Sequence, residues 1–359
     1  MKTKLFILLL LLSLTAAAQP PHPDAEFKVF QFPVNQIPRI DGDDSDWAIV
    51  PESYVVGTKD MWDDTGVHKQ ADVSTPDIRV KVGWVKGENR LYFLYDATDN
   101  YWDFSRPGLE ADIFELVVDA DRSGGPLINR FHPLKDKGVD SWEAFFSMHG
   151  VHAQNYHIFT PAVEKDWCMV WGCQSWIKQL PYANAAYRFN FKPGEKGRLM
   201  LEFFITPFDY AGTEPARSVP SVLKENKKIG MSWAVIDFDD VNSKDKNGFW
   251  NLSSQHTMYG QADYLRTFRL MPPEPAFSKK IEAKWSFTIL DMERRLVAFK
   301  DESVGEIKSR HWDFGDGTVS DEQHPQHIYK EAGHYIVTLS VEGVGGKSKL
   351  TKVWDVTVR

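Results

Sequence analysis

An acidic turn in the first half of the chain carries residue types suited to a hard cation. Asp119, Asp121 and Ser123 place oxygen atoms at alternate positions, and the pair Gly124-Gly125 follows them. Calcium loops use this spacing, with glycine at the sharp turn. Arg130 stands where a helix-loop-helix calcium hand carries its bidentate glutamate. The segment therefore predicts either a structural calcium turn that takes further ligands from elsewhere, or a plain solvated turn.

A segment from about residue 150 to 185 is rich in aromatic and imidazole side chains. We interpret it as an inserted loop in which Trp171 and Trp176 either wall a ligand cleft or belong to an apolar flap that seals one sheet. An enzymatic alternative, a polysaccharide lyase, would draw its base and its acidic-sugar anchor from four residues in and around this segment: His149, Tyr156, His157 and Arg188.

The sequence lacks the other common catalytic signatures. It contains no Gly-x-Ser-x-Gly elbow, no phosphate-binding loop, no dinucleotide fingerprint and no His-Glu-x-x-His motif. Paired carboxylates for glycoside hydrolysis stay open, because a chain with 50 acidic residues places some pair near any cleft. No catalytic residue is assigned.

The two cysteines, Cys168 and Cys173, lie six residues apart counted inclusively. In an oxidising compartment this spacing predicts a disulfide, with free buried thiols or metal ligands as the alternatives.

The N-terminus has the pattern of a secretory signal peptide over residues 1–18. Lys2 and Lys4 precede the apolar run 5–14, and small residues at 16–18 suit a signal peptidase. We therefore expect a secreted or periplasmic protein, with no later segment long enough to span a membrane. Removal of the two lysines takes the formal net charge from −8 to −10. This charge disfavours a nucleic-acid partner, which needs a basic face.

Hydrophobic alternation predicts an all-β chain in which strands are separated by Gly, Pro, Asn and Asp clusters. Strand-like runs lie at 78–84, 90–97, 113–119, 142–148, 187–191, 198–205, 230–238 and 265–270. They suggest a large antiparallel β-sandwich over residues 27–271. Prolines at 272, 273 and 275 predict an extended linker over 272–279, followed by a second domain over 280–359.

Three motifs in the last quarter of the chain occur in order at strand spacing. They are Trp-Asp-Phe-Gly-Asp-Gly at 312–317, His-Pro-x-His-x-Tyr at 324–329 and Gly-x-Tyr-x-Val-Thr-Leu at 333–339. Together they resemble the polycystic kidney disease (PKD) repeat, which implies an immunoglobulin-like β-sandwich. Such repeats space or adhere, so the distinguishing activity is expected upstream.

The upstream region resembles the family 9 carbohydrate-binding module. The resemblance rests on Ile-Asp-Gly-Asp-Asp-Ser-Asp-Trp at 40–47, on the strand, hairpin and strand at 80–99, on Glu-x-Asp-x-x-Glu-Leu-x-x-Asp at 110–119, and on the closing segment 248–270. The motif at 40–47 has one residue fewer than the family pattern. Modules of this family often carry structural calcium.

The resemblance assigns a sugar-binding role to several residues. Trp250 falls at the position of a stacking aromatic, and Glu115, with Asp112 as the weaker partner, falls at the hydroxyl-binding acids. The other stacking position holds Leu109, so Tyr101 or Trp102 is the candidate replacement. For Trp250 and Glu115 the alternative is a role in the sandwich core or in pinning a loop.

A sugar site needs an aromatic plane for the C–H face of a pyranose and polar groups for its hydroxyls. Ser232 and Ala234 replace amide side chains expected in the family, so the ligand is expected to differ from the family's usual sugar-chain ends. The sequence favours a secreted, non-catalytic protein that captures an oligo- or polysaccharide in support of glycan-degrading partner enzymes. A glycoside hydrolase or lyase on the same sandwich, and a purely adhesive protein, remain alternatives.

Overall fold

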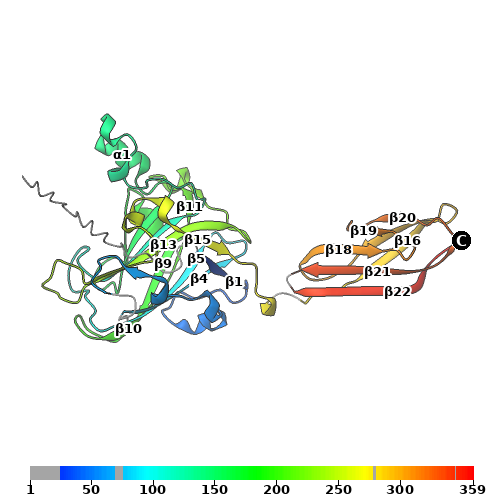
Figure 1. The fold of residues 1–359 in the computed structure, drawn as a ribbon, viewed down its shortest axis with the longest axis horizontal. Coiled ribbons are helices and arrows are strands. Elements are labelled where there is room, and N and C mark those ends of the chain that lie inside the picture. Colours follow the sequence, from blue (N-terminus) through cyan, green and yellow to red (C-terminus); the bar gives the residue numbers. More distant parts are fainter. Residues whose placement is uncertain (1–24, 69–75, 278–279, 344) are drawn as a thin grey trace, which may run out of the picture. The chain divides into compact units, whose positions relative to one another are not determined.

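The computed structural model describes residues 25–68, 76–277, 280–343 and 345–359, with the side chains of 353–355 excluded. The predicted signal peptide lies outside these residues. The chain divides into two compact units (Figure 1). Unit 1 comprises the chain up to Val29 together with Pro38–Leu270, and unit 2 comprises Phe30–Ile37 together with Met271–Arg359.

Unit 1 is a β-sandwich, which confirms the fold class predicted from the sequence. One layer has the order β8 (Cys168–Val170), β7 (Gln154–Phe159), β6 (Ile113–Asp119), β13 (Lys228–Asp237), β15 (Arg266–Leu270) and β1 (Glu26–Phe32). The other has β4 (Asp77–Val85), β5 (Leu91–Asp99), β10 (Gly197–Ile205) and β9 (Ala183–Arg188). The neighbours β4–β5, β5–β10, β6–β7 and β6–β13 are antiparallel, whereas β1 pairs with β15 in parallel.

Short strands and helices complete unit 1. The strand β14 (Gly248–Asn251) pairs with β13 and with β3 (Trp62–Asp63), and β2 (Val56–Gly57) pairs with β4. The strand β11 (Phe208–Tyr210) pairs with β12 (Val219–Pro220). The single-turn helices are η1 (Asp44–Ile49), η2 (Glu52–Tyr54), η3 (Thr58–Asp60), η5 (Asn129–Phe131), η6 (Lys135–Lys137), η7 (Ser175–Lys178), η8 (Pro215–Arg217), η9 (His256–Tyr259) and η10 (Ala262–Tyr264). Within the described residues, no helix is both long and apolar enough to cross a membrane.

The alternation of side chains along β6 separates two packing layers. Phe114, Leu116 and Val118 belong to the main core between the sheets. Val117 faces the opposite way, into a smaller cluster with Leu127, Ile128, Phe249 and Met258. The outer face of this sheet is therefore covered by the segments around η5, β14 and η9 instead of facing water.

Glu202 holds the acidic motif at 40–47 against β10. Its side chain is buried, and Oε2 accepts hydrogen bonds from the backbone N–H groups of residues 41, 42 and 43 at 3.1, 2.7 and 3.1 Å. Oε1 accepts one from the indole Nε1–H of Trp47 at 2.7 Å. Gly42 has φ +78°, and a Cβ there would lie 2.9 Å from the Tyr187 carbonyl carbon. The motif is thus a structural clamp, since a buried carboxylate requires several donors.

Two elements differ from the sequence-based prediction. Residues 142–148 were predicted to form a strand but belong to helix α1 (Ser141–Met148), whose N-cap Asp140 accepts hydrogen bonds from the N–H groups of Trp142 and Glu143. The predicted inserted loop at about 150–185 instead holds β7, β8, η7 and the start of β9. Its aromatic residues arise partly from strands that extend the sheets.

Unit 2 is a smaller sandwich of two sheets preceded by η11 (Pro275–Phe277). One sheet has the order β16 (Trp285–Asp291), β17 (Leu296–Asp301) and β20 (Gln326–Ile328), and the other has β19 (Val319–Ser320), β18 (Ile307–Asp313), β21 (Gly333–Gly343) and β22 (Gly346–Val358). Trp285 and Trp312 pack edge to face in its core, with ring centroids 5.7 Å apart. Tyr329 is buried and donates its hydroxyl hydrogen bond to the Phe314 carbonyl oxygen.

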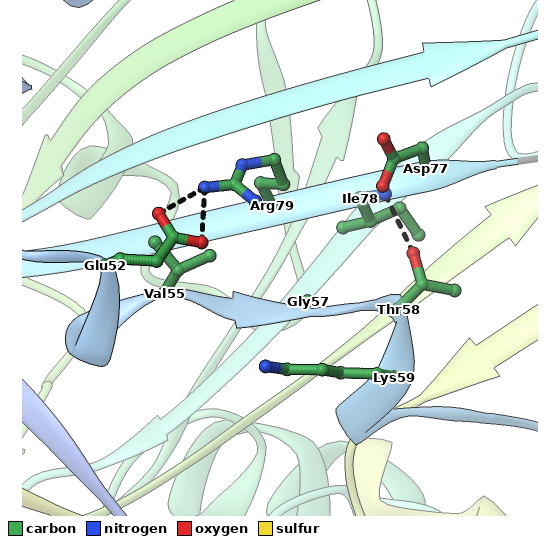
Figure 2. Close-up of a pocket in the computed structure, with 8 residues that line it drawn as sticks. All are labelled: Glu52, Val55, Gly57, Thr58, Lys59, Asp77, Ile78 and Arg79. Atoms are coloured by element: carbon green, nitrogen blue, oxygen red, sulfur yellow. Dashed lines mark hydrogen bonds and ion pairs between the residues drawn. The ribbon is translucent and has the colours of Figure 1, made fainter.

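We expect Glu202→Gln to lower the free energy of unfolding of unit 1 by about 3 kcal/mol. Both side-chain oxygens of Glu202 accept hydrogen bonds, whereas the NH₂ group of an amide cannot accept one. Urea unfolding of the full chain measures this change. Glu52→Gln is the matched control, since Glu52 is exposed and pairs with Arg79 at the surface (Figure 2), where an ion pair contributes at most about 1 kcal/mol. Equal effects of the two substitutions would contradict the role assigned to Glu202.

Candidate functional site

Glu115 and His157 lie side by side on the outer face of the first layer. On the two neighbouring strands, the residues opposite Glu115 of β6 are Ala234 of β13 and His157 of β7. His157 lies opposite Met169 of β8. Glu115 is 3% exposed, and His157 is also buried. A carboxyl group at such a position needs hydrogen-bond donors close to it, because burial removes its contact with water.

Three side chains form a hydrogen-bonded relay at this position. The indole Nε1–H of Trp171 donates to Nδ1 of His157 at 2.7 Å, and Nε2 of His157 lies 3.1 Å from Oε1 of Glu115. Because Nδ1 accepts, the proton of the neutral imidazole is assigned to Nε2, which donates to Glu115. Asn155 adds an amide N–H to the same oxygen at 2.9 Å. This relay fixes the orientation of the Trp171 ring.

Burial controls the ionisation of this pair. Desolvation raises the pKa of Glu115 from 4.5 to about 7, while the Asn155 hydrogen bond and the charges of Lys246 and His256 act in the opposite direction. Desolvation also lowers the pKa of His157 to about 3. His157 is therefore neutral near pH 7, consistent with its place as both acceptor and donor in the relay.

A series of ring contacts leads from Trp171 to the surface. We call Trp171, His149, Phe145, Phe146 and Trp142 the aromatic strip. The rings of Trp171 and His149 are stacked 5.9 Å apart, and His149 lies 5.0 Å from Phe145. Phe145 lies 5.5 Å from Phe146, which stacks against Trp142 at 6.0 Å and 24°. The strip ends on α1, which projects from the sheets of unit 1 (Figure 1).

The α1 end of the aromatic strip is its most exposed part, whereas His149 within it is buried. Trp171 and Phe145 are half-buried, whereas Phe146 is 51% exposed and Trp142 is 67% exposed. Both outer rings come from the segment that sequence analysis assigned to a strand. The spacing of aromatic residues at 142, 145 and 146, following the N-cap Asp140, is a helical pattern that could have revealed this surface.

The structure contradicts the stacking roles predicted for Trp250 and Trp102. Trp250 is 0% exposed, and its indole packs in the main core beside His68. Trp102 is 2% exposed, stacks on Phe191 and donates its indole N–H to the carbonyl oxygen of Gly197. Neither ring presents a face to a ligand, because strand pairing at β14 and packing against the 189–197 segment enclose them.

The remaining predicted sugar contacts are engaged with other parts of the protein. Asp112 is buried, and its two oxygens accept hydrogen bonds from the N–H groups of Phe238 and Asp103, so it pins two loops. Tyr101 is half-buried, with its hydroxyl 3.4 Å from the Val241 nitrogen. Trp176 donates its indole N–H to Gly212 and packs against Phe208 and Tyr182. Of the predicted set, the structure brings together Glu115 and Trp171.

The predicted disulfide is wrong. Cys168 and Cys173 are free thiols. Cys168 points into the main core from β8, whereas Cys173 is half-buried in the bend after that strand. Desolvation raises the pKa of both thiols, so neither has the character of a reactive thiolate.

In the acidic turn at 119–125, the carboxylate oxygens accept hydrogen bonds from backbone N–H groups of the turn itself. Oδ2 of Asp119 accepts a hydrogen bond from the N–H of Gly124, and Asp119 and Asp121 both accept from the N–H of Ser123. Burial raises the pKa of Asp119 to about 6. A calcium ion at Asp119, Asp121 and Ser123 remains a prediction.

The residues proposed for a lyase do not converge. Tyr156 is fully buried in the main core, because it alternates with His157 along β7. Arg188 pairs with Asp43 at 2.7 Å in another part of the surface. A hollow of about 300 Å³ lies beside β2 and β4, but the side chains that line it include no aromatic ring: Glu52, Val55, Thr58, Lys59, Asp77, Ile78 and Arg79 (Figure 2).

The fold and these surfaces define a two-part β-sandwich protein, and comparison with known proteins gives the relatives of each part. Residues 293–358 match the family model of the PKD domain. The PKD1 domain of Vibrio anguillarum Epp is 28% identical, covers 23% of this chain and 99% of its own, and gives a TM-score of 0.21. The resemblance of the C-terminal region to a PKD repeat is therefore confirmed.

Structural comparison of the chain also finds similarity to a larger solved module. A family 9 carbohydrate-binding module from Caldicellulosiruptor kristjanssonii, solved in complex with cellotriose, covers 70% of this chain and 95% of its own at 11% identity and a TM-score of 0.45. Collagenase ColA of Bacillus cereus is 49% identical over 43 residues, which span 12% of this chain and 4% of the collagenase.

We expect a pH-dependent difference in stability between the wild type and Glu115→Gln. Between pH 4.5 and about 7, Glu115 stays protonated in the folded chain but loses its proton in the unfolded chain. The protonated carboxyl group therefore contributes stability that is complete at low pH and is lost as the pH rises through about 7. Relative to the glutamine variant, the wild type should lose on the order of 3 kcal/mol over this window. Urea unfolding at pH 4.5, 6 and 8 measures the difference, and other titrating groups cancel in the comparison.

The exposed neighbour Glu110 provides the control for this experiment. Glu110→Gln tests whether removing any nearby carboxyl group gives the same result, since its side chain is exposed. The prediction for Glu115 is contradicted if the stability difference between the wild type and Glu115→Gln does not change with pH.

Proposed function

We propose that unit 1 binds a saccharide against the outer end of the aromatic strip. The observation that carries this proposal is the pair of nearly parallel rings, Trp142 and Phe146, which are 67% and 51% exposed on a helix that projects from the sheets. Two adjacent large rings left in water are unfavourable for an isolated protein, whereas a pyranose can cover them with its apolar C–H face.

Polar groups beside the strip suit the hydroxyl rim of a sugar. The short helix η5 lies next to α1, and the side chain of Asn129 contacts His149 of the strip at 3.1 Å. Arg130 is exposed and stacks over Phe131 and Tyr259, which leaves its guanidinium N–H groups at the surface. Glu143 lies on the exposed side of α1. Amide, guanidinium and carboxylate groups are the donors and acceptors that carbohydrate recognition uses.

The shape of this surface favours a particular class of ligand. We treat the proposed surface as an open ridge, because of the two stacking positions expected from the family resemblance one holds the buried Trp250 and the other holds Leu109, which is not aromatic. A ridge contacts one side of an extended chain and does not require a chain end. We therefore infer that the ligand is an internal stretch of an oligo- or polysaccharide.

The proposed biological role combines this surface with the rest of the chain. The predicted signal peptide would place the protein outside the cytoplasm, in the medium or the periplasm. There, unit 1 would capture a polysaccharide, and unit 2, which contains the PKD match, would act as a spacer. Glycan-degrading enzymes would act on the captured polymer as partners.

We expect Trp142→Ala and Phe146→Ala each to weaken glycan binding by about tenfold or more, since losing one stacked ring face removes at least ~1.4 kcal/mol. A glycan array with the mature chain identifies the best oligosaccharide, and isothermal titration calorimetry then measures its affinity for each variant. Thermal unfolding should be unchanged, because both side chains lie at the surface.

Tyr210→Ala is the matched control, because Tyr210 is an exposed aromatic residue of unit 1 outside the strip. Its substitution should leave the affinity unchanged. Binding that persists in the double variant Trp142→Ala/Phe146→Ala would overturn the proposed site. Absence of binding to any glycan would favour an adhesive scaffold, and depolymerisation of a bound glycan would favour an enzyme.

A further inference from the structure

Two cations of unit 1 are held against aromatic rings in the segments that cover the first layer. Lys246 precedes β14, and its ammonium group lies 4.0 Å from the centre of the Phe249 ring. Arg130 belongs to η5, and its guanidinium group lies 5.0 Å from the ring of Phe131 and 5.6 Å from that of Tyr259. Contact with an aromatic face limits the positions that each charged group can take.

A series of ring contacts connects the two cations. The ring of His256 lies 4.9 Å from that of Phe249, which Lys246 contacts. The same imidazole lies 5.8 Å from the ring of Tyr259, which Arg130 contacts. We call Phe249, His256 and Tyr259 the outer ring series. It places a positive charge at each of its two ends.

These two cations lack the acidic partners that other cations of unit 1 have. In the part of the chain that the structure describes, neither the Lys246 ammonium group nor the Arg130 guanidinium group forms an ion pair or a hydrogen bond. Arg79, Arg188 and Arg198, in contrast, each pair with a carboxylate. Charged groups held in place beside rings, with their donors unused, are typical binding groups for an anion.

Lys246 is half-buried, which makes its lack of a partner costly. Desolvation lowers the pKa of Lys246, and the charges of Asp64, Glu115 and Asp63 oppose this effect without cancelling it. The side chains of Asp63 and Asp64 are themselves almost completely buried. A partly desolvated ammonium group of this kind is stabilised when an external anion binds to it.

The two cations extend the surface proposed to bind a saccharide. The side chain of Asn129 lies 3.1 Å from Nδ1 of His149 in the aromatic strip, and Arg130 is the next residue of η5. A polysaccharide that lies on the exposed rings of α1 and continues over η5 therefore meets Arg130 first. Lys246 follows at the far end of the outer ring series.

We propose that the bound saccharide is an acidic polysaccharide whose uronate carboxylates pair with Arg130 and Lys246. The inference rests on the proposed function, because it names the class of polysaccharide bound at that surface. The guanidinium fork matches a planar carboxylate, and the ammonium group binds one as a point charge. The formal net charge of −8 repels a polyanion at long range, so this recognition acts at contact distance.

The test compares acidic oligosaccharides with their own methyl esters, which keep the sugar chain and remove its charge. The probes are oligogalacturonate, oligomannuronate and a glucuronate-containing oligosaccharide, titrated calorimetrically into the full mature chain at low ionic strength. At least one acid should bind about tenfold more tightly than its ester. Added salt should reduce this preference, because it screens the charges.

Substitution of the two cations tests their part in this preference. Lys246→Met and Arg130→Met each remove the charge and keep an unbranched side chain. Each should lower the affinity for the acid by about tenfold and the affinity for the ester by less. Lys244→Met is the matched control, since Lys244 is an exposed lysine in the same loop as Lys246. It should retain the preference, and thermal unfolding checks that all variants fold.

Trp142→Ala separates failure of this inference from failure of the proposed function. The substitution should weaken binding of acid and ester alike. Equal affinities for acid and ester, both lowered by Trp142→Ala, would overturn the acidic ligand and leave the proposed site in place. A preference that persists in both methionine variants, or a sulfated probe that binds more tightly than every uronate, would also overturn it. Acid binding that Trp142→Ala leaves unchanged would overturn the proposed function.

Discussion

The burial of the Glu115 carboxyl group is the constraint on which the candidate site depends. Alternation along β6 places its neighbours Phe114 and Leu116 in the main core and sends Glu115 to the opposite face, beneath the covering segments. A carboxyl group there must be surrounded by donors. His157 and Asn155 meet this need, and His157 in turn fixes Trp171, where the aromatic strip begins. The exposed rings on α1 are thus connected to a buried carboxyl group through an unbroken series of side-chain contacts.

Other buried acids in unit 1 also need hydrogen-bond donors, and they differ in which groups supply them. Glu202 is satisfied by three backbone N–H groups and one indole, so it serves as a clamp for the segment that opens the domain. Asp112 is satisfied by two backbone N–H groups and fixes two loops. Asp237 has no such partner for its Oδ1 atom. A buried acid whose oxygens are hydrogen-bonded can hold a fold together, whereas an oxygen left without a donor is destabilising.

The fold could be predicted from the sequence where strands alternate clearly. The run 113–119 became β6 without any change of boundary, and the predicted runs near β4, β5, β10, β13 and β15 shifted by only a few residues. The segment 142–148 failed because its apolar residues fit a helix as well as a buried strand, and the N-cap Asp140 decides between them. The PKD motifs could be recognised because their turn and core residues are fixed in order.

The candidate site was harder to predict because exposure depends on tertiary covering. Trp250 occupies a position that suits a ligand platform, but the sequence does not show that His68 and the main core enclose its ring. Asp99 is far in sequence from Asp237 and Asp239, and these acids converge only because β5 and β13 end close to each other. Such long-range convergence has no local sequence signal.

The most direct test of the central claim observes the tryptophan indole N–H signals by NMR while an array-selected oligosaccharide is titrated into the isotopically labelled chain. Signals are assigned by single Trp→Phe substitutions. The account predicts that the Trp142 indole signal shifts strongly and that of Trp171 shifts less, while those of the buried Trp250 and Trp102 stay in place. Shifts confined to Trp250 or Trp102 would contradict it, because they would mean that the rings buried in this structure open to receive the sugar.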